Sequence, residues 1–269
     1  MTLFEPEDLP PAAPSGPLVR VRMTLAYDGG AFHGFAAQPG VTTVGGTLAA
    51  TLQRVLGHPV DLVCAGRTDA GVHGWGQVVS FNADAARFDA ARLQAAVNGL
   101  CGPAMAVREV AVADSPDFSA RFDARARRYR YTVLNRPVPD PFLATTAWHV
   151  AQPLDVRAMQ AACDPLIGEH DFTSFCRRPK GEDEPSMTRR VLDARWELDE
   201  AAGEGVLRFW IEATAFCHQM VRSITGTLVD VGLGKRTAAD VLSALRARRR
   251  SAAGPVAPPH GLCLWEVVY

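Results

Sequence analysis

One ten-residue segment, AGRTDAGVHG at 65–74, holds the side chains best suited to chemistry. Its three glycines let the backbone turn sharply and approach a ligand closely. Asp69 can act as a nucleophile or general base without a metal, because a carboxylate is ionised at neutral pH and the nearby Arg67 would keep it so. A reactive carboxylate on a loop between rigid elements is typical of a catalytic site.

The spacing of these residues alone leaves other interpretations open. Asp69 could cap a turn through hydrogen bonds to nearby backbone, and His73 could be a structural histidine. Asp69 and His73 together would also suit a metal-independent hydrolase of small esters or phosphates. Such a hydrolase would need no arginine cluster, so the distribution of charge helps to separate these alternatives.

Positive charge is concentrated in this chain, although the net charge is only −1. Five arginines fall within residues 121–130, and others lie within 177–190. Tyr129 and Tyr131 share one side of an expected strand and Arg130 lies on the other, which favours an aromatic platform and a basic patch that bind RNA. Core aromatics and a solvated charged face would give the same pattern. A non-catalytic RNA-binding protein of two sheet-and-helix modules is a further alternative.

The elements expected around the 65–74 segment alternate in an α+β order. Period-two alternation and turn signals predict strands at 21–27, 60–64, 76–81, 105–112, 129–134, 192–198, 207–213 and 263–268. Apolar residues three and four apart predict helices at 45–56, 90–100, 156–166, 216–231 and 241–250. This order predicts helices on one face of a largely antiparallel sheet. The fourth helix separates His218 and Arg222 by four residues, so both could face a cleft.

Two sheet-and-helix halves, 20–116 and 117–269, account for this order. The acidic, proline-rich residues 1–19 predict a disordered tail, and the polar stretch 177–190 predicts a mobile loop. No apolar run approaches the roughly 20 residues that span a bilayer, and no secretory signal is present, so we expect a cytoplasmic protein. The six cysteines lack any zinc-ligand spacing, which favours free thiols and no metal site.

The segment GRTDAGVHGWGQV at 66–78 resembles the active-site motif of the tRNA pseudouridine synthase A family. Other segments resemble signatures of this family in the same order, namely YDG at 27–29, ARRYRY at 126–131, DFTSF at 171–175, AFCHQMVRSITG at 215–226 and GL at 261–262. The resemblance covers about residues 20–269. It implies the pseudouridine synthase fold, in which two halves form a largely antiparallel sheet with a central cleft.

The resemblance also implies roles for individual residues. Asp69 would attack the target uridine, Arg67 would pair with that carboxylate, and Tyr129 would stack on the base. The other residues expected to bind the substrate are Arg128, Arg222, Leu262, His73 and Gln77. The implied reaction isomerises uridine to pseudouridine at positions 38, 39 and 40 of the tRNA anticodon arm, without a cofactor or metal. The resemblance further implies a homodimer whose two chains cradle one tRNA.

Overall fold

The computed structural model describes residues 16–178 and 186–269. Its strands are β1 Leu18–Tyr27, β2 Val63–Cys64, β3 His73–Asp84, β4 Met105–Val112, β5 Ala126–Asn135, β6 Trp148–Val150, β7 Gly168–Asp171, β8 Thr188–Leu198, β9 Val206–Ala213 and β10 Leu262–Val268. Its helices are α1 Val44–Leu56, α2 Ala90–Cys101, α3 Val156–Ala161, α4 Met220–Gly232 and α5 Ala238–Ala247. Within these residues no helix is long and apolar enough to cross a membrane.

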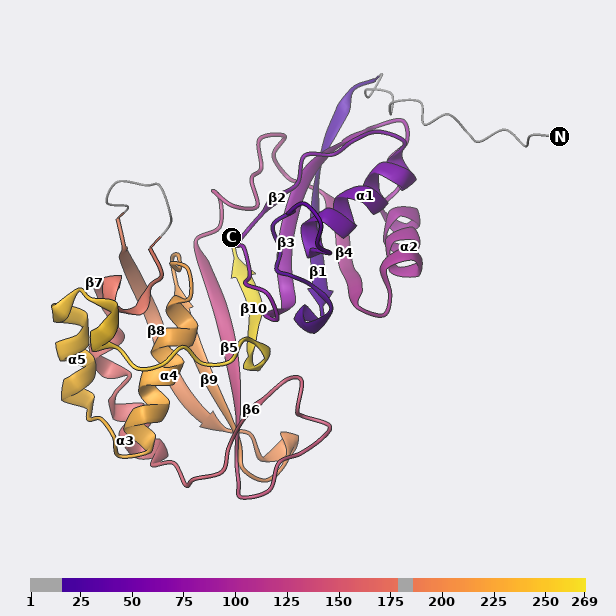
Figure 1. The fold of residues 1–269 in the computed structure, drawn as a ribbon. Helices are drawn as coiled ribbons and strands as arrows, with labels where there is room; N and C mark the ends of the chain where they lie inside the picture. Colours follow the sequence, from indigo (N-terminus) through magenta and orange to yellow (C-terminus); the bar gives the residue numbers. More distant parts are fainter. Residues whose placement is uncertain (1–15, 179–185) are drawn as a thin grey trace.

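A single sheet of ten strands runs through the molecule (Figure 1). Eight of the strands follow the order β4-β1-β3-β10-β5-β9-β8-β7, while β2 pairs with β3 and β6 pairs with β5. The pairings of β10 with β3 and of β5 with β6 are parallel, and the other pairings are antiparallel. The expected α+β class with a largely antiparallel sheet is therefore confirmed.

The helices form two groups that lie toward opposite ends of the sheet (Figure 1). α1 and α2 bury apolar side chains against β1, β3 and β4, and Met23, Leu48 and Phe81 belong to this cluster. α3, α4 and α5 do the same against β5, β8 and β9, where Phe209 and Leu228 are buried. The central strands β3, β10 and β5 lie between the two groups.

Both helix groups lie on the same face of the sheet. Tyr27 on β1 pairs with Gly74 on β3, Gly74 pairs with Leu264 on β10, and Leu264 pairs with Tyr129 on β5. Directly paired residues share a face, and both Tyr27 and Tyr129 contact helix-side clusters. We call this the helix-bearing face and the opposite one the open face.

The strand β10 joins the two ends of the sheet. It runs parallel to β3 on one side and antiparallel to β5 on the other, although it follows α5 in the chain. The buried side chains form one large cluster built mainly from residues after 117 and a second built from residues 21–107. Division into halves at 116 and 117 stays a prediction, because β10 belongs to the later half and pairs with β3 of the earlier one.

Several expected boundaries differ from the structure for identifiable reasons. The fourth helix begins at Met220 instead of 216, because Gln219 takes a left-handed backbone conformation with φ of 64°. The helix expected at 156–166 ends at Ala161, since Pro165 has no amide hydrogen to continue it.

The two segments expected to be disordered are only partly described. β1 already begins at Leu18, inside the expected tail, and β8 begins at Thr188, inside the expected mobile loop. The remaining parts of those expectations, residues 1–15 and 179–185, lie outside the described residues.

Gly226 allows α4 to pack closely on the segment at 255–257. A Cβ atom at Gly226 would lie 1.9 Å from the carbonyl oxygen of Pro255. Gly226→Ala is therefore expected to lower the free energy of unfolding by about 3 kcal/mol, measured by urea denaturation. Gly99→Ala is the matched control on α2, because its Cβ would meet no atom within 4 Å and alanine favours a helix. Equal stability of the two variants would contradict this packing.

Candidate active site

The 65–74 segment leads from β2 into β3, and side chains from two strands hold the start of its backbone. Arg127 on β5 donates from Nε and Nη2 to the carbonyl oxygen of Ala65, at 3.1 and 2.8 Å. Gln77 on β3 donates to the carbonyl oxygen of Gly66 at 2.7 Å. The beginning of the loop is therefore fixed by the sheet itself.

The middle of the loop is held by β1 and the segment that follows it. The Tyr27 hydroxyl lies 2.9 Å from Thr68 Oγ1, and the Phe35 amide donates to the carbonyl oxygen of Thr68 at 3.0 Å. Only glycine fits at position 29, because a Cβ there would lie 2.2 Å from the carbonyl oxygen of Val72. Contacts on both sides thus set the direction of the side chain at position 69.

Two basic side chains hold the carboxylate of Asp69 by its two oxygens. Arg222 on α4 donates from Nη1 to Oδ2 at 3.0 Å, and His218 Nε2 lies 3.2 Å from Oδ1. Arg222 is fixed in turn, since its Nε donates to the carbonyl oxygen of Ala257 at 2.8 Å. The Asp69 side chain is 24% exposed. The arrangement presents an oriented, partly open carboxylate, as nucleophilic or general-base chemistry requires.

Tyr129 and Leu262 lie on the helix-bearing face near this carboxylate. The Tyr129 ring packs edge to face with Phe216, with 5.0 Å between the ring centroids. Burial first, and then the neighbouring Tyr27 and Asp69, raises the pKa of Tyr129 above the ordinary phenol value. Leu262 is buried in the same apolar cluster. The structure thus brings Asp69, Tyr129 and the arginine on α4 into one region, and Leu262 lies on the same face of the sheet, opposite Tyr131 on β5.

The expected pair between Arg67 and Asp69 is not formed. Arg67 has an exposed side chain, and the ion-pair partners of Asp69 among the described residues are Arg222 and His218. The tight turn directs the neighbouring side chains of the loop differently, while the first turn of α4 brings Arg222 to the carboxylate. This corrects the expectation drawn from the 65–74 segment alone.

Arg128 does not lie beside Tyr129, and its expected role in substrate binding stays a prediction. Successive side chains of a strand point to opposite faces, so Arg128 lies on the open face while Tyr129 lies on the helix-bearing face. Two carboxylates there already neutralise the Arg128 guanidinium, Glu212 at 2.7 Å and Glu266 at 2.6 Å. The alternation of side chains along β5 was expected. It places Arg128 and Arg130 on one face of the sheet, and Tyr129 and Tyr131 on the other.

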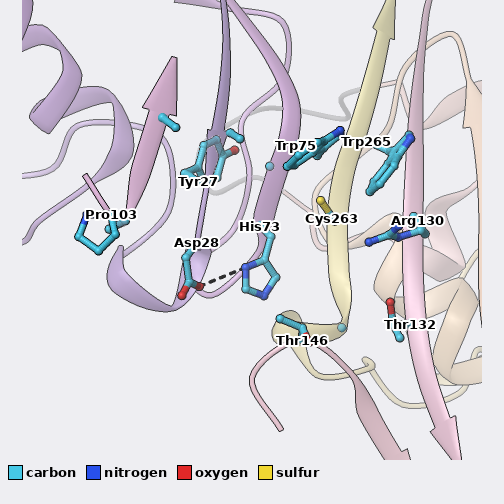
Figure 2. Close-up of a pocket in the computed structure, with 15 residues that line it drawn as sticks. Tyr27, Asp28, His73, Trp75, Pro103, Arg130, Thr132, Thr146, Cys263 and Trp265 are labelled. Carbon is cyan, nitrogen blue, oxygen red and sulfur yellow. Dashed lines mark ion pairs between the residues drawn. The ribbon is translucent and has the colours of Figure 1, made fainter. Parts of the chain in front are cut away.

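His73 does not contact Asp69, which removes the geometric basis for the hydrolase alternative. Its Nδ1 lies 3.2 Å from Asp28 Oδ1 and 3.1 Å from the amide nitrogen of Gly29. Figure 2 shows this pair at the edge of a cavity of about 300 Å³ whose other wall includes Trp75 and Trp265. The lining of that cavity does not include Asp69, so substrate binding by His73 at the carboxylate is not supported.

Gln77 is fully buried beneath the loop, and its expected role as a substrate-binding residue stays a prediction. Its amide nitrogen donates to the carbonyl oxygen of Gly66 at 2.7 Å and lies 3.5 Å from the Tyr27 hydroxyl. The contact that the structure shows for this side chain is therefore support of the loop.

Arg127 has a clear role in the site but was not singled out by sequence. It was grouped with the basic run, although strand alternation places it on the same face as Tyr129, where it holds the loop. His218 was expected to face a cleft together with Arg222, and the structure brings both side chains to Asp69. His218 does so from a loop before α4, and not from the helix on which it was expected.

The chain is similar to known proteins over most of its length. The family model described as tRNA pseudouridine synthase matches residues 23–123 and 162–269. A protein of Brevibacillus brevis named tRNA pseudouridine synthase A is 42% identical over 252 residues, which cover 93% of this chain and 99% of that protein. Proteins of the same name from Caulobacter sp. and Bacillus subtilis are 41% and 40% identical over 93% of this chain and 98% and 99% of their own lengths. The chain therefore belongs to the tRNA pseudouridine synthase family.

Proposed function

We propose that this protein isomerises uridine to pseudouridine in cytoplasmic tRNA, with Asp69 as the attacking carboxylate. The observation that carries the proposal is the carboxylate held by Arg222 and His218 beside the Tyr129 ring, between the two helix groups of the sheet. Family membership supports the substrate class, because the matching proteins are named for tRNA.

The proposed reaction changes connectivity without oxidation or reduction. The bond between ribose C1′ and uracil N1 breaks, the uracil turns, and a new bond forms between C1′ and C5. The hydrogen on C5 leaves as a proton, and N1 gains a proton. An oriented carboxylate can supply the electron pair that begins this exchange and can accept the proton that ends it. The balance requires no oxidant or reductant, in keeping with the expectation that no cofactor is used.

The target base must leave its stack before the carboxylate can reach it. Extrusion of a base costs a few kcal/mol, and stacking on an aromatic side chain returns about 1–3 kcal/mol. Tyr129 is the aromatic residue beside Asp69 that can supply this contact, with Leu262 as apolar surface near it. The same contact keeps water from the reacting atoms.

Release of tritium from tRNA labelled at uracil C5 tests the activity, because forming the new carbon bond expels that hydrogen. We expect the protein to release tritium and to leave pseudouridine in the product. Binding of tRNA without any release would instead support the non-catalytic RNA-binding alternative.

We further propose that the modified uridines are those at positions 38, 39 and 40 of the anticodon arm. Three transcripts that each carry the labelled uridine at only one of these positions should all release tritium. A fourth transcript, labelled only in another stem, is the control and should release none. Release from the fourth alone would contradict the assignment to the anticodon arm.

The proposal includes a homodimer that forms through the open face of the sheet. On this face Arg130 stacks over Trp265 at 3.8 Å, Trp265 lies 5.8 Å from Trp75, and Arg108 caps Trp75 at 4.2 Å. Burial first, and then the nearby charge of Arg208, lowers the pKa of Arg130 to about 10, so it stays charged.

Acids and bases also alternate across the open face. Arg195 pairs with Asp193 and Glu197, and Arg128 pairs with Glu212. A surface with apolar area and balanced charge is complementary to a second copy of itself, as a two-fold dimer requires. A dimer would place two helix-bearing faces outward, where each could meet RNA.

Trp75 is the most direct test of the dimer, because this residue is 44% exposed and stacks on Trp265 in this group of aromatic side chains. Trp75→Asp is expected to weaken dimerisation by at least about 2 kcal/mol, since a charge would be buried in an apolar contact. Size-exclusion chromatography with light scattering at micromolar concentration measures the change. Phe122→Asp, at a 79% exposed aromatic residue outside this group, is the control and should leave the dimer intact. A monomeric wild-type protein would refute the proposal.

A further inference from the structure

The two oxygens of the Asp69 carboxylate are held very differently. Arg222 is 14% exposed and bridges Oδ2 to the backbone at Ala257, so it links the carboxylate to the interior. His218 is 44% exposed, and its contact with Oδ1 at 3.2 Å is the one interaction that its side chain makes among the described residues. A partly solvated contact of this kind stabilises little, whereas a largely buried arginine pair is hard to break.

The backbone around His218 holds the imidazole over Oδ1. The carbonyl oxygen of His218 accepts from the Arg177 amide at 2.9 Å. The next residue, Gln219, has φ of 64°, a conformation that few residues other than glycine adopt, and it begins α4. Strained backbone of this kind persists only where its surroundings fix it, and it is common at functional sites. The side chain can rotate away while the backbone stays in place.

A uridine has to approach the carboxylate from its solvent-exposed side, and the structure distinguishes the two oxygens by the exposure and the second contacts of their partners. We propose that His218 covers Oδ1 in the RNA-free protein and is displaced when the target uridine enters, so that Oδ1 is the reacting oxygen and Arg222 stays on Oδ2. This inference rests on the proposed function, in which Asp69 attacks the substrate.

Tritium release by the full-length protein tests this gate, with kcat and KM measured separately. We expect kcat/KM of His218→Ala to rise above the wild-type value by about threefold, because the uridine then displaces no side chain from Oδ1. His218→Gln keeps a side-chain N–H donor that can contact Oδ1, so its kcat/KM should lie between those of the wild type and His218→Ala.

A second readout and a control variant make the outcome decisive. The change in His218→Ala should appear in KM and not in kcat, since the proposed reaction proceeds with the imidazole displaced. His33→Ala, at an exposed histidine outside the site, is the control and should leave kcat/KM at the wild-type value. Thermal unfolding of each variant checks that the fold is intact.

A kcat/KM of His218→Ala at or below the wild-type value would overturn the proposal. So would a loss of kcat above about tenfold in His218→Ala, because His218 would then act in the reacting complex. Wild-type protein that releases no tritium would mean that the proposed function has failed, which is a different result from either of these.

Discussion

Asp69→Asn abolishes tritium release from tRNA, by a factor of about 10⁴ or more, if the carboxylate is the attacking group. Asparagine has the same shape but lacks the negative charge and the free electron pair of a carboxylate. Its side chain can still accept a hydrogen bond from Arg222 and can still contact His218, so the loop contacts described above survive. The change therefore removes reactivity and leaves the architecture of the site in place.

Binding separates this outcome from a loss of substrate affinity. Affinity of Asp69→Asn for an unlabelled tRNA should lie within about threefold of wild type in a filter or fluorescence titration, because phosphate contacts supply most of the affinity for nucleic acid. Asp28→Asn is the matched control, since Asp28 is an exposed carboxylate paired with His73 outside the site. Retention of more than about a hundredth of the wild-type rate in Asp69→Asn would show that another group attacks.

Arg222→Met should give the second large loss. Methionine fills much of the same space, but it leaves Oδ2 without its donor and frees the carbonyl oxygen of Ala257. We expect kcat to fall by about 10²–10³, the usual effect of removing one oriented electrostatic partner from an active site. The free energy of unfolding should fall by about 2 kcal/mol, because the carboxylate left behind is mostly buried.

Lys235→Met is the control that shows whether the losses of kcat and stability expected for Arg222→Met are specific to the site. Lys235 lies just after α4 and is 3.9 Å from Asp230, with 65% of its side chain exposed. Lys235→Met should change neither kcat nor stability by a measurable amount, since an exposed ion pair contributes little. Arg222→Lys should recover part of the activity of Arg222→Met, because it restores a charge but not the fork that reaches two acceptors. A normal rate in Arg222→Met would rule out the role assigned to this residue.

The sequence indicated those parts of the structure that depend on local periodicity. Alternation around Val21 and Met23 predicted β1, and the spacing of Leu48, Leu52 and Leu56 predicted α1. The glycine-rich segment around Asp69 was found because sharp turns and reactive side chains coincide there. Boundaries failed where one residue overrides a pattern, as Gln219 does at the start of α4.

The partners within the site could not be derived in the same way. Asp69 and Arg222 are separated by 153 residues, and only the assembled sheet brings them together. Sequence proximity favoured Arg67 as the partner, but a turn sends neighbouring side chains in different directions. Arg128 shows a related limit, since alternation indicates that two side chains point to opposite faces but not which face carries the site. The family resemblance gave Arg222 a place in the pocket, and the register of the strands explains how it arrives there.

The position of β10 bears on how the molecule assembles as it is synthesised. Residues 262–268 fill the gap between β3 and β5, so both strands have an unpaired edge until the ribosome has made that segment. Translation therefore passes through a stage in which two subassemblies exist without a shared sheet, and the end of the loop at 65–74, where β3 begins, lacks its neighbouring strand β10. Pairing over such a sequence separation makes the last folding step slow relative to local helix formation. Catalytic competence must consequently follow completion of β10 in time, and it cannot build up gradually along the growing chain.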